Sequence, residues 1–98
     1  MGKLVYGHAD EVLQLDDRTL AHLAAVIVSK WRRGEKFLFT WSPTADSAAG
    51  TRALWMHPEV PLRLTFASSG HPQLNRRWLE LLLASADSPS GLQLLPEP

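Results

Sequence analysis

Two stretches of the chain carry apolar residues at the three- and four-residue spacing of an amphipathic helix. In the first, Asp16 or Asp17 is placed to cap the start, and Gly34 follows a cationic end. In the second, Asn75 is the expected cap, and the helix continues to about Ala86. The apolar positions are Leu20, Leu23, Ala24, Ile27 and Trp31 in the first helix, and Trp78, Leu79, Leu81, Leu82 and Leu83 in the second.

Elsewhere apolar residues alternate with polar ones, as they do in strands with one buried face. Glycine, proline and polar clusters separate these segments, and the small residues 43–50 predict an exposed loop. The predicted strands are residues 3–6, 11–15, 36–42, 52–57, 62–67 and 92–95. With the two helices, the order is ββαβββαβ. We therefore predict a single α+β domain over residues 1–98, with a mainly antiparallel sheet and both helices packed on one face.

Length and charge narrow the class of protein. Ninety-eight residues, of which 45% are hydrophobic and 20% charged, indicate a folded globular domain. The chain has no cysteine, which excludes disulfides and thiolate metal sites. No apolar run is long enough to span a membrane, and the N-terminal residues lack the apolar stretch of a signal peptide, so we expect a cytoplasmic protein without a membrane partner. Ten basic and ten acidic residues cancel, whereas domains that bind nucleic acid usually carry a positive excess.

Positive charge is nevertheless concentrated where the first helix ends and the next strand begins. Lys30, Arg32, Arg33 and Lys36 lie there, and such a cluster suits contact with a phosphate backbone. The pair Arg76–Arg77, at the start of the second helix, would add to the cluster if that start lies nearby. The alternative interpretation is a solvated helix end whose cations interact with the last carbonyl groups of the helix.

A second candidate surface follows from the pairing of residues 36–42 with residues 52–57. If eight loop residues close this hairpin, Leu38 pairs with Trp55, and Trp55 lies on the face away from the helices. A tryptophan among cations on an open sheet can stack a nucleic-acid base, or it can form the centre of a dimer interface. A shift of one residue in this pairing would bury Trp55 in the core instead. The residues of this face are Lys36, Leu38, Thr40, Ala53, Trp55 and His57, with Arg63 and Thr65 beside them.

No arrangement of residues indicates catalysis. The histidines show no metal-ligand spacing, and we expect all of them to face solvent; they are His8, His22, His57 and His71. The serines in loops lack the Gly-x-Ser-x-Gly elbow of a hydrolase, and the glycines do not form a phosphate-binding loop. We therefore expect neither a metal nor a cofactor.

Five segments are the most distinctive: DDRTLAHL (16–23), RRGEKFLFTW (32–41), HPEVPL (57–62), NRRWLE (75–80) and SADSPSGLQLLPEP (85–98). They resemble a family of small actinobacterial proteins of unestablished function, which often carry the automatic label ATP-dependent DNA ligase. A ligase attacks ATP with a lysine amine, and its family signature is Lys-x-Asp-Gly. No lysine of this chain stands in such a motif, and one domain of this size is too small to enclose a nicked duplex and ATP. The resemblance therefore favours a non-catalytic domain that is related to a ligase or once neighboured one.

The sequence thus predicts a small non-catalytic binding domain. Nucleic acid, bound weakly and in a salt-sensitive way, is the first partner to test. The alternative is a structural or protein-interaction domain that homodimerises through the open face of its sheet. The residues that we expect to bind the partner are Lys30, Arg32, Arg33, Lys36, Trp55, His57 and Arg63.

Overall fold

The computed structural model describes residues 1–8, 11–42, 50–70 and 72–98. Its helices and strands follow one another in the predicted order, ββαβββαβ, so the α+β class is confirmed. Apart from Gly50, the loop predicted over residues 43–50 lies outside the described residues, and so does His71. The elements are β1 (Gly2–Tyr6), β2 (Glu11–Leu15), α1 (Asp17–Arg32), β3 (Phe37–Trp41), β4 (Arg52–Met56), β5 (Leu62–Thr65), α2 (Arg76–Ala86) and β6 (Leu92–Gln93).

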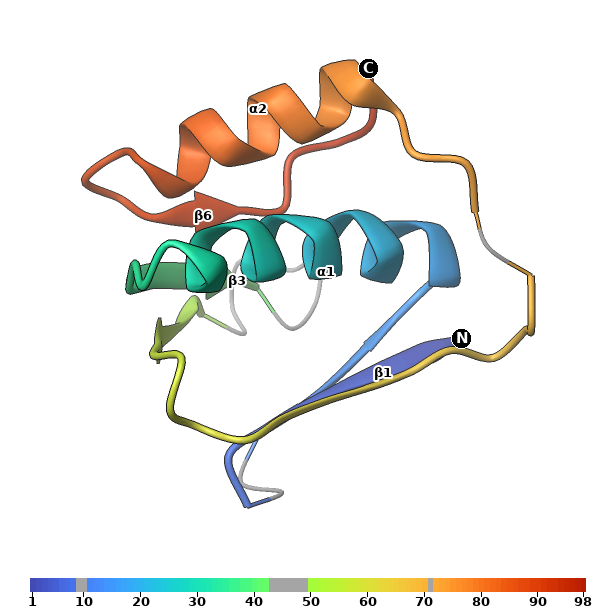
Figure 1. Cartoon of the computed structure of the whole chain (residues 1–98), viewed down its shortest axis with the longest axis horizontal. Helices are drawn as coiled ribbons and strands as arrows, with labels where there is room; N and C mark the ends of the chain where they lie inside the picture. Colours follow the sequence, from blue (N-terminus) through green and yellow to red (C-terminus); the bar gives the residue numbers. More distant parts are fainter. Residues whose placement is uncertain (9–10, 43–49, 71) are drawn as a thin grey trace.

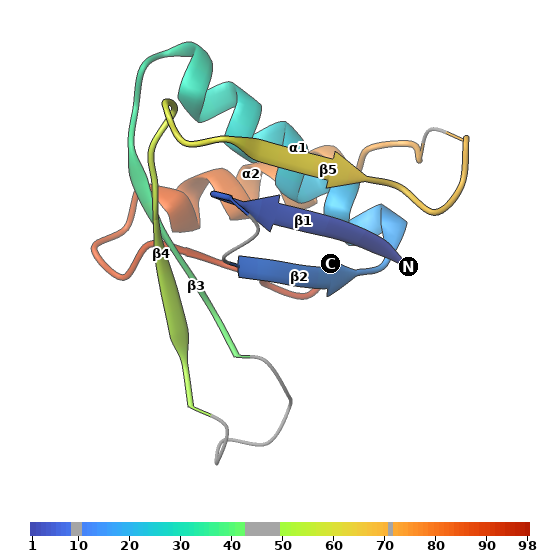
Figure 2. The same cartoon turned by 90° about the horizontal axis from the view of Figure 1, so that it is seen from below.

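These strands form two three-stranded sheets, whereas the sequence predicts one. In the first sheet β1 lies between β2 and β5, and both pairings are antiparallel. In the second sheet β3 lies between β4, its antiparallel neighbour, and β6, which runs parallel to it. Figure 2 shows the β3–β4 pair crossing the direction of the other sheet. The pairing is mainly antiparallel, as predicted.

The chain changes sheets between β4 and β5, and the local chemistry explains why. Tyr6 donates its hydroxyl hydrogen to the Trp55 carbonyl and accepts the N–H of His57, so a residue of the first sheet occupies the outer edge of β4. Pro58 and Pro61 follow, and neither has an N–H group with which to continue a ladder. Strand β5 therefore pairs with β1 instead of joining the second sheet.

Both helices begin at the residues that the sequence predicts as caps. The Asp16 side chain accepts hydrogen bonds from the hydroxyl and the backbone N–H of Thr19, and these bonds, the hydroxyl one most of all, lower the pKa of Asp16. In α2 the Asn75 side chain accepts the N–H of Trp78. After α1, Gly34 adopts a φ of 69°, a left-handed conformation that glycine tolerates best, and the chain turns towards β3.

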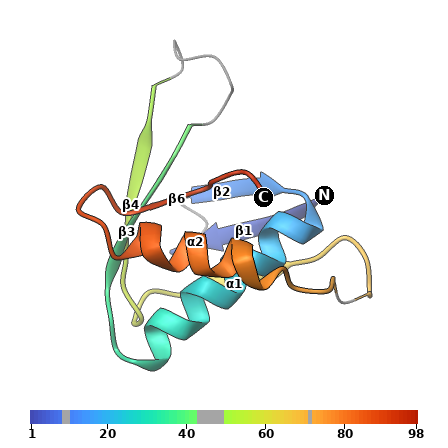
Figure 3. The ribbon, with the colours of Figure 1, turned by 90° about the horizontal axis from the view of Figure 1, so that it is seen from above.

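Helix α1 is covered on two sides, and this arrangement decides which of its residues are buried. It lies against the sheet of β1 on one side and against α2 on the other, and the two helices run in the same direction (Figures 1 and 3). Of the predicted apolar stripe, Leu20, Leu23 and Ile27 are fully buried, whereas Ala24 and Trp31 are half-buried. A second row at four-residue spacing, consisting of His22, Val26 and Lys30, is buried as well. The prediction that His22 faces solvent is therefore wrong, because α2 covers that side of α1.

One apolar core joins the helices and the two sheets. Phe39, in the centre of β3, is fully buried in it, and its ring stacks on Trp41 with 5.2 Å between the ring centroids. The outer face of the β3–β4 pair contributes no buried residue, so this face remains open. The buried apolar residues are Leu4, Tyr6, Leu13, Leu20, Leu23, Val26, Ile27, Phe37, Phe39, Met56, Trp78, Leu82, Ala86 and Leu92.

Candidate functional site

The pairing of β3 with β4 determines which face carries Trp55. Leu38 lies opposite Trp55, as predicted, and Phe39 lies opposite Leu54. Side chains alternate between the two faces of a strand, so Phe39 enters the core while Trp55 points outwards. Trp55 is 57% exposed. The alternative register, which would place this tryptophan in the core, is therefore wrong.

A hollow of about 420 Å³ lies beside Trp55. The beginning of β3, part of β4 and the turn after α2 form its walls. Gly91 allows this turn to approach β3 closely, because it has a φ of 83° and a Cβ there would lie 2.5 Å from the Leu38 carbonyl oxygen. The surface combines one large aromatic ring with charged groups of both signs. Its lining residues include Glu35, Lys36, Leu38, Trp55, Asp87, Ser88 and Pro89.

Lys30 borders this hollow, but it is not the exposed cation that the sequence predicted. It is 5% exposed and pairs with the carboxylates of Asp87 and Glu35; its Nζ lies 3.3 Å from Oε1 of Glu35. The hydrogen bond to Asp87 is the main reason why the pKa of Lys30 is raised. Because both acids already neutralise Lys30, its assignment to the phosphate-binding cluster is corrected: it ties the end of α1 to the end of α2.

The other three cations of the predicted cluster are exposed. Arg32 and Arg33 lie at the end of α1, and Lys36 immediately precedes β3 and lines the hollow. No ion pair joins any of these three to another residue in the described part of the chain. They give the surroundings of the hollow a small positive excess over Glu35 and Asp87.

His57 and Arg63, the remaining predicted site residues, are not part of the hollow. His57 is half-buried, and its Nδ1 accepts the N–H of Glu59, so the ring is held by the turn that leads to β5. Arg63 is exposed, but it lies in β5 and pairs with Val5 of β1. The expectation that Arg63 sits beside Trp55 assumed one continuous sheet, and the division into two sheets places them in different ladders.

Arg76 and Arg77 do not extend the basic cluster either. Both are exposed at the first turn of α2, which lies next to His22, because Asn75 donates its N–H to that histidine. Lys30 lies two turns further along α1, where α2 ends. Since the helices run in the same direction, the two arginines are at one end of the helix pair and the Trp55 hollow is at the other.

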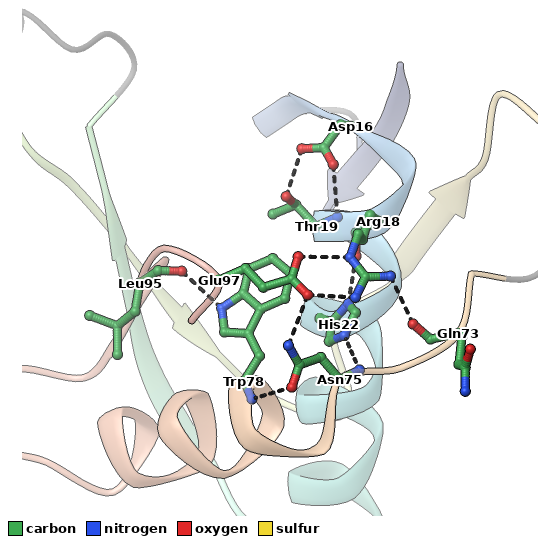
Figure 4. A network of polar contacts seen from close by, with 9 residues as sticks. All are labelled: Asp16, Arg18, Thr19, His22, Gln73, Asn75, Trp78, Leu95 and Glu97. Atoms are coloured by element: carbon green, nitrogen blue, oxygen red, sulfur yellow. Dashed lines mark hydrogen bonds and ion pairs between the residues drawn. The ribbon is translucent and has the colours of Figure 1, made fainter.

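A second polar cluster, which no pattern in the sequence predicts, joins the C-terminal residues to the start of both helices (Figure 4). Glu97 accepts two hydrogen bonds from the Arg18 guanidinium, at 2.7 and 2.5 Å, and a third from the Asn75 side chain at 2.9 Å. The Arg18 bonds are the main cause that lowers the pKa of Glu97 to about 2. Trp78 donates its indole N–H to the Leu95 carbonyl. These contacts hold the last residues of the chain in place.

His22 is the buried centre of this cluster. Its Nδ1 lies 2.7 Å from the Arg18 carbonyl oxygen, and its Nε2 accepts the backbone N–H of Asn75 at 2.8 Å. Since a carbonyl oxygen only accepts, the proton belongs on Nδ1 and the ring is neutral. The ring also packs on Trp78, with 4.4 Å between centroids. Both nitrogens have partners inside the protein, so this cluster is structural.

The described residues contain neither a metal-binding cluster nor a membrane-spanning helix. Among residues 1–8, 11–42, 50–70 and 72–98, no group of three or more histidine, aspartate or glutamate side chains is placed to hold a metal ion. None of the helices in that part of the chain is long and apolar enough to cross a membrane.

Comparisons with known proteins give a family but no characterised relative. No curated protein matches the sequence, and no solved structure matches the fold. One family does match, over residues 1–97, and it is described as a domain of unknown function, DUF7882. Because the match covers nearly the whole chain, the protein belongs to the DUF7882 family.

Proposed function

We propose that this protein is a small non-catalytic binding domain whose Trp55 hollow contacts single-stranded nucleic acid. The observation that carries the proposal is the 57% exposure of Trp55, on an open strand face beside a hollow of about 420 Å³ that Lys36 also lines. An aromatic face on a sheet stacks any base, and nearby cations track the phosphates.

The expected binding is weak and sensitive to salt. A base stacked on Trp55 contributes about 1–3 kcal/mol. Arg32, Arg33 and Lys36 provide three phosphate contacts, because Lys30 is already paired. For a single strand these contacts give a log–log salt slope of about −2, so the affinity falls about 20-fold between roughly 50 and 200 mM salt.

A homodimer through the same face is the alternative, and the size of the apolar surface favours nucleic acid. Around Trp55 the outer face carries Leu38, Thr40 and Ala53, of which Leu38 and Thr40 are partly buried. The exposed part of the tryptophan offers about 140 Å². A specific protein interface buries about 800 Å² on each partner. One or two stacked bases fit this surface better than a second subunit does.

The test is a titration of a labelled single-stranded oligonucleotide at low and physiological salt, followed by fluorescence anisotropy. The double variant Arg32→Ala, Arg33→Ala removes two of the three exposed cations near the Trp55 hollow. It should weaken binding and make the affinity depend less steeply on salt. Its matched control is Arg76→Ala with Arg77→Ala, which changes the net charge equally at the other end of the helices and should have little effect.

Trp55 is tested with a pair of apolar substitutions. Trp55→Leu removes the aromatic face and should lower the affinity by roughly 5- to 150-fold, whereas Trp55→Phe keeps a stacking face and should lose less. Both should fold, because the side chain is largely outside the core. The proposal fails if wild type shows no binding at low salt, or if both arginine pairs weaken binding equally. A wild-type dimer that Trp55→Glu converts to monomers would support the alternative.

A further inference from the structure

Strand β2 is an edge of its sheet, and its outward backbone groups can be identified from the pairing. The N–H of Gly7 bonds to the Pro61 carbonyl, so the odd-numbered residues of β1 bond to β5 and the even-numbered ones bond to β2. In the β1–β2 register, Leu4 then uses the N–H and C=O groups of Leu13. The backbone groups of the intervening β2 residues, Val12 and Gln14, point away from the sheet.

The other three sheet edges carry protection that β2 lacks. The Tyr6 hydroxyl occupies the edge of β4, and Pro61 precedes β5, which carries the exposed Arg63. On β6 the Gln93 N–H bonds to the Ser85 hydroxyl, and its carbonyl accepts the Leu95 N–H. Natural edges are usually blunted by such groups, by charges or by proline.

The charge that β2 carries, Glu11, lies at its first residue and pairs with Arg52, and in the described part of the chain no charge or proline stands at the two outward-facing positions, Val12 and Gln14. Val12 is 50% exposed, Gln14 is exposed and uncharged, and the strand contains no proline. No hydrogen bond from the described residues reaches the outward N–H and C=O groups of Val12 and Gln14. The edge therefore presents two donors and two acceptors in the arrangement that an added strand requires.

The outer edge of β2 lines a groove of about 650 Å³, which is larger than the hollow of about 420 Å³ beside Trp55. One wall is β2, and the opposite wall combines polar groups with the half-buried ring of Trp41 and the Leu94 side chain. The charged residues among the described lining, Glu11 and Arg52, pair with each other at 3.1 Å. The groove consequently has no net charge to attract a charged ligand, and it suits uncharged side chains.

We propose that the outer edge of β2 binds an extended peptide of a partner protein, which adds to the first sheet as a fourth strand. Val12 and Gln14 supply the backbone bonds, and alternate apolar side chains of the peptide pack against Trp41 and Leu94. A single strand fits better than a second copy of this protein. The β3–β4 pair projects beyond β2 (Figure 2), so the helix layer behind another copy's edge strand would meet it.

The test uses a phage-displayed library of peptides of about ten residues, the length of a long strand, selected on the wild-type protein. Peptides that also bind the variant Gln14→Pro are removed by counter-selection. This variant lacks one outward N–H but keeps the β1–β2 ladder, since proline is tolerated on a strand edge. Enriched peptides should alternate apolar and polar residues. Synthetic copies should bind Gln14→Pro at least about tenfold more weakly and bind Gln14→Ala, which keeps the N–H, as tightly as wild type.

Amide hydrogen exchange locates the bound peptide. Exchange at Val12 and Gln14 should slow when the peptide is added. The proposal is overturned if no peptide is enriched over the Gln14→Pro background, if Gln14→Pro and Gln14→Ala bind equally well, or if these amides are unaffected. If the same amides are protected in the protein without peptide, and the protein has twice the monomer mass in solution, the edge binds a second copy and the peptide proposal is overturned. If Gln14→Pro does not fold, Val12→Pro removes the other outward N–H and gives the same comparison.

Discussion

Replacing His22 with phenylalanine separates the polar role of this buried residue from its packing. The histidine is fully buried, accepts the Asn75 N–H at 2.8 Å and packs on Trp78 at 4.4 Å. Phenylalanine keeps an aromatic ring of similar shape against Trp78 but cannot accept a hydrogen bond. The change therefore isolates the cost of leaving one backbone N–H without a partner at the start of α2.

The structure sets the size of the effect. The Arg18 carbonyl, which loses the Nδ1 hydrogen bond, keeps its bond within the helix, so its loss is small. The Asn75 N–H has no such substitute, and an unsatisfied buried donor costs about 1–3 kcal/mol. His22→Ala loses the ring as well, and deletion of a buried aromatic side chain costs about 3–5 kcal/mol. For a small domain whose total stability is about 5–15 kcal/mol, the alanine variant is expected to lose a large part of it.

Urea denaturation followed by circular dichroism at neutral pH measures both variants. The expected order of stability is wild type, then His22→Phe, then His22→Ala. His8→Ala is the control, because His8 is exposed and its loss should change the free energy of unfolding by less than about 0.5 kcal/mol. A His22→Phe protein as stable as wild type would show that the Asn75 N–H does not depend on the imidazole, and the proposed hydrogen bond would have to be abandoned.

Two further predictions concern the chain end and the turn beside the hollow. Arg18 is the main cause that lowers the pKa of Glu97 from 4.5 to about 2, so the stabilisation from Glu97 is present above pH 4.5 and is lost as the pH falls towards 2. In urea, Glu97→Gln should therefore be less stable than wild type at neutral pH and equally stable near pH 2. A difference in stability that does not change with pH would contradict this prediction. Gly34→Ala should cost about 1–2 kcal/mol for its positive φ alone, since nothing lies within 4 Å of the added Cβ. Gly91→Ala should lower the thermal midpoint further, because its Cβ also meets the Leu38 backbone; equal midpoints for the two variants would refute the close approach.

Much of the fold could be predicted because its signals are local. The caps of both helices, the glycine after α1 and the alternation in β3 and β4 each depend on a few neighbouring residues. The register that pairs Leu38 with Trp55 followed from the loop length and the apolar alternation, and it correctly placed Trp55 outside the core. The division into two sheets depends instead on Tyr6 reaching β4, a contact between residues 49 positions apart. No local pattern encodes such a contact.

The candidate site shows the same limit, and it changes the number of phosphate contacts expected. In the sequence, Lys30 resembles its basic neighbours Arg32 and Arg33. In the helix, however, it shares a buried face with His22 and Val26, which lie eight and four residues earlier, and it pairs with Asp87. The four-residue spacing of this row was the sequence signal for the burial of Lys30. The burial of Lys30 has a measurable consequence for the proposed binding. Four phosphate contacts from the cluster would give a slope of log affinity against log salt of about −3 for single strands, whereas three contacts give about −2. A measured slope near −3 would mean that Lys30 leaves Asp87 when the nucleic acid binds.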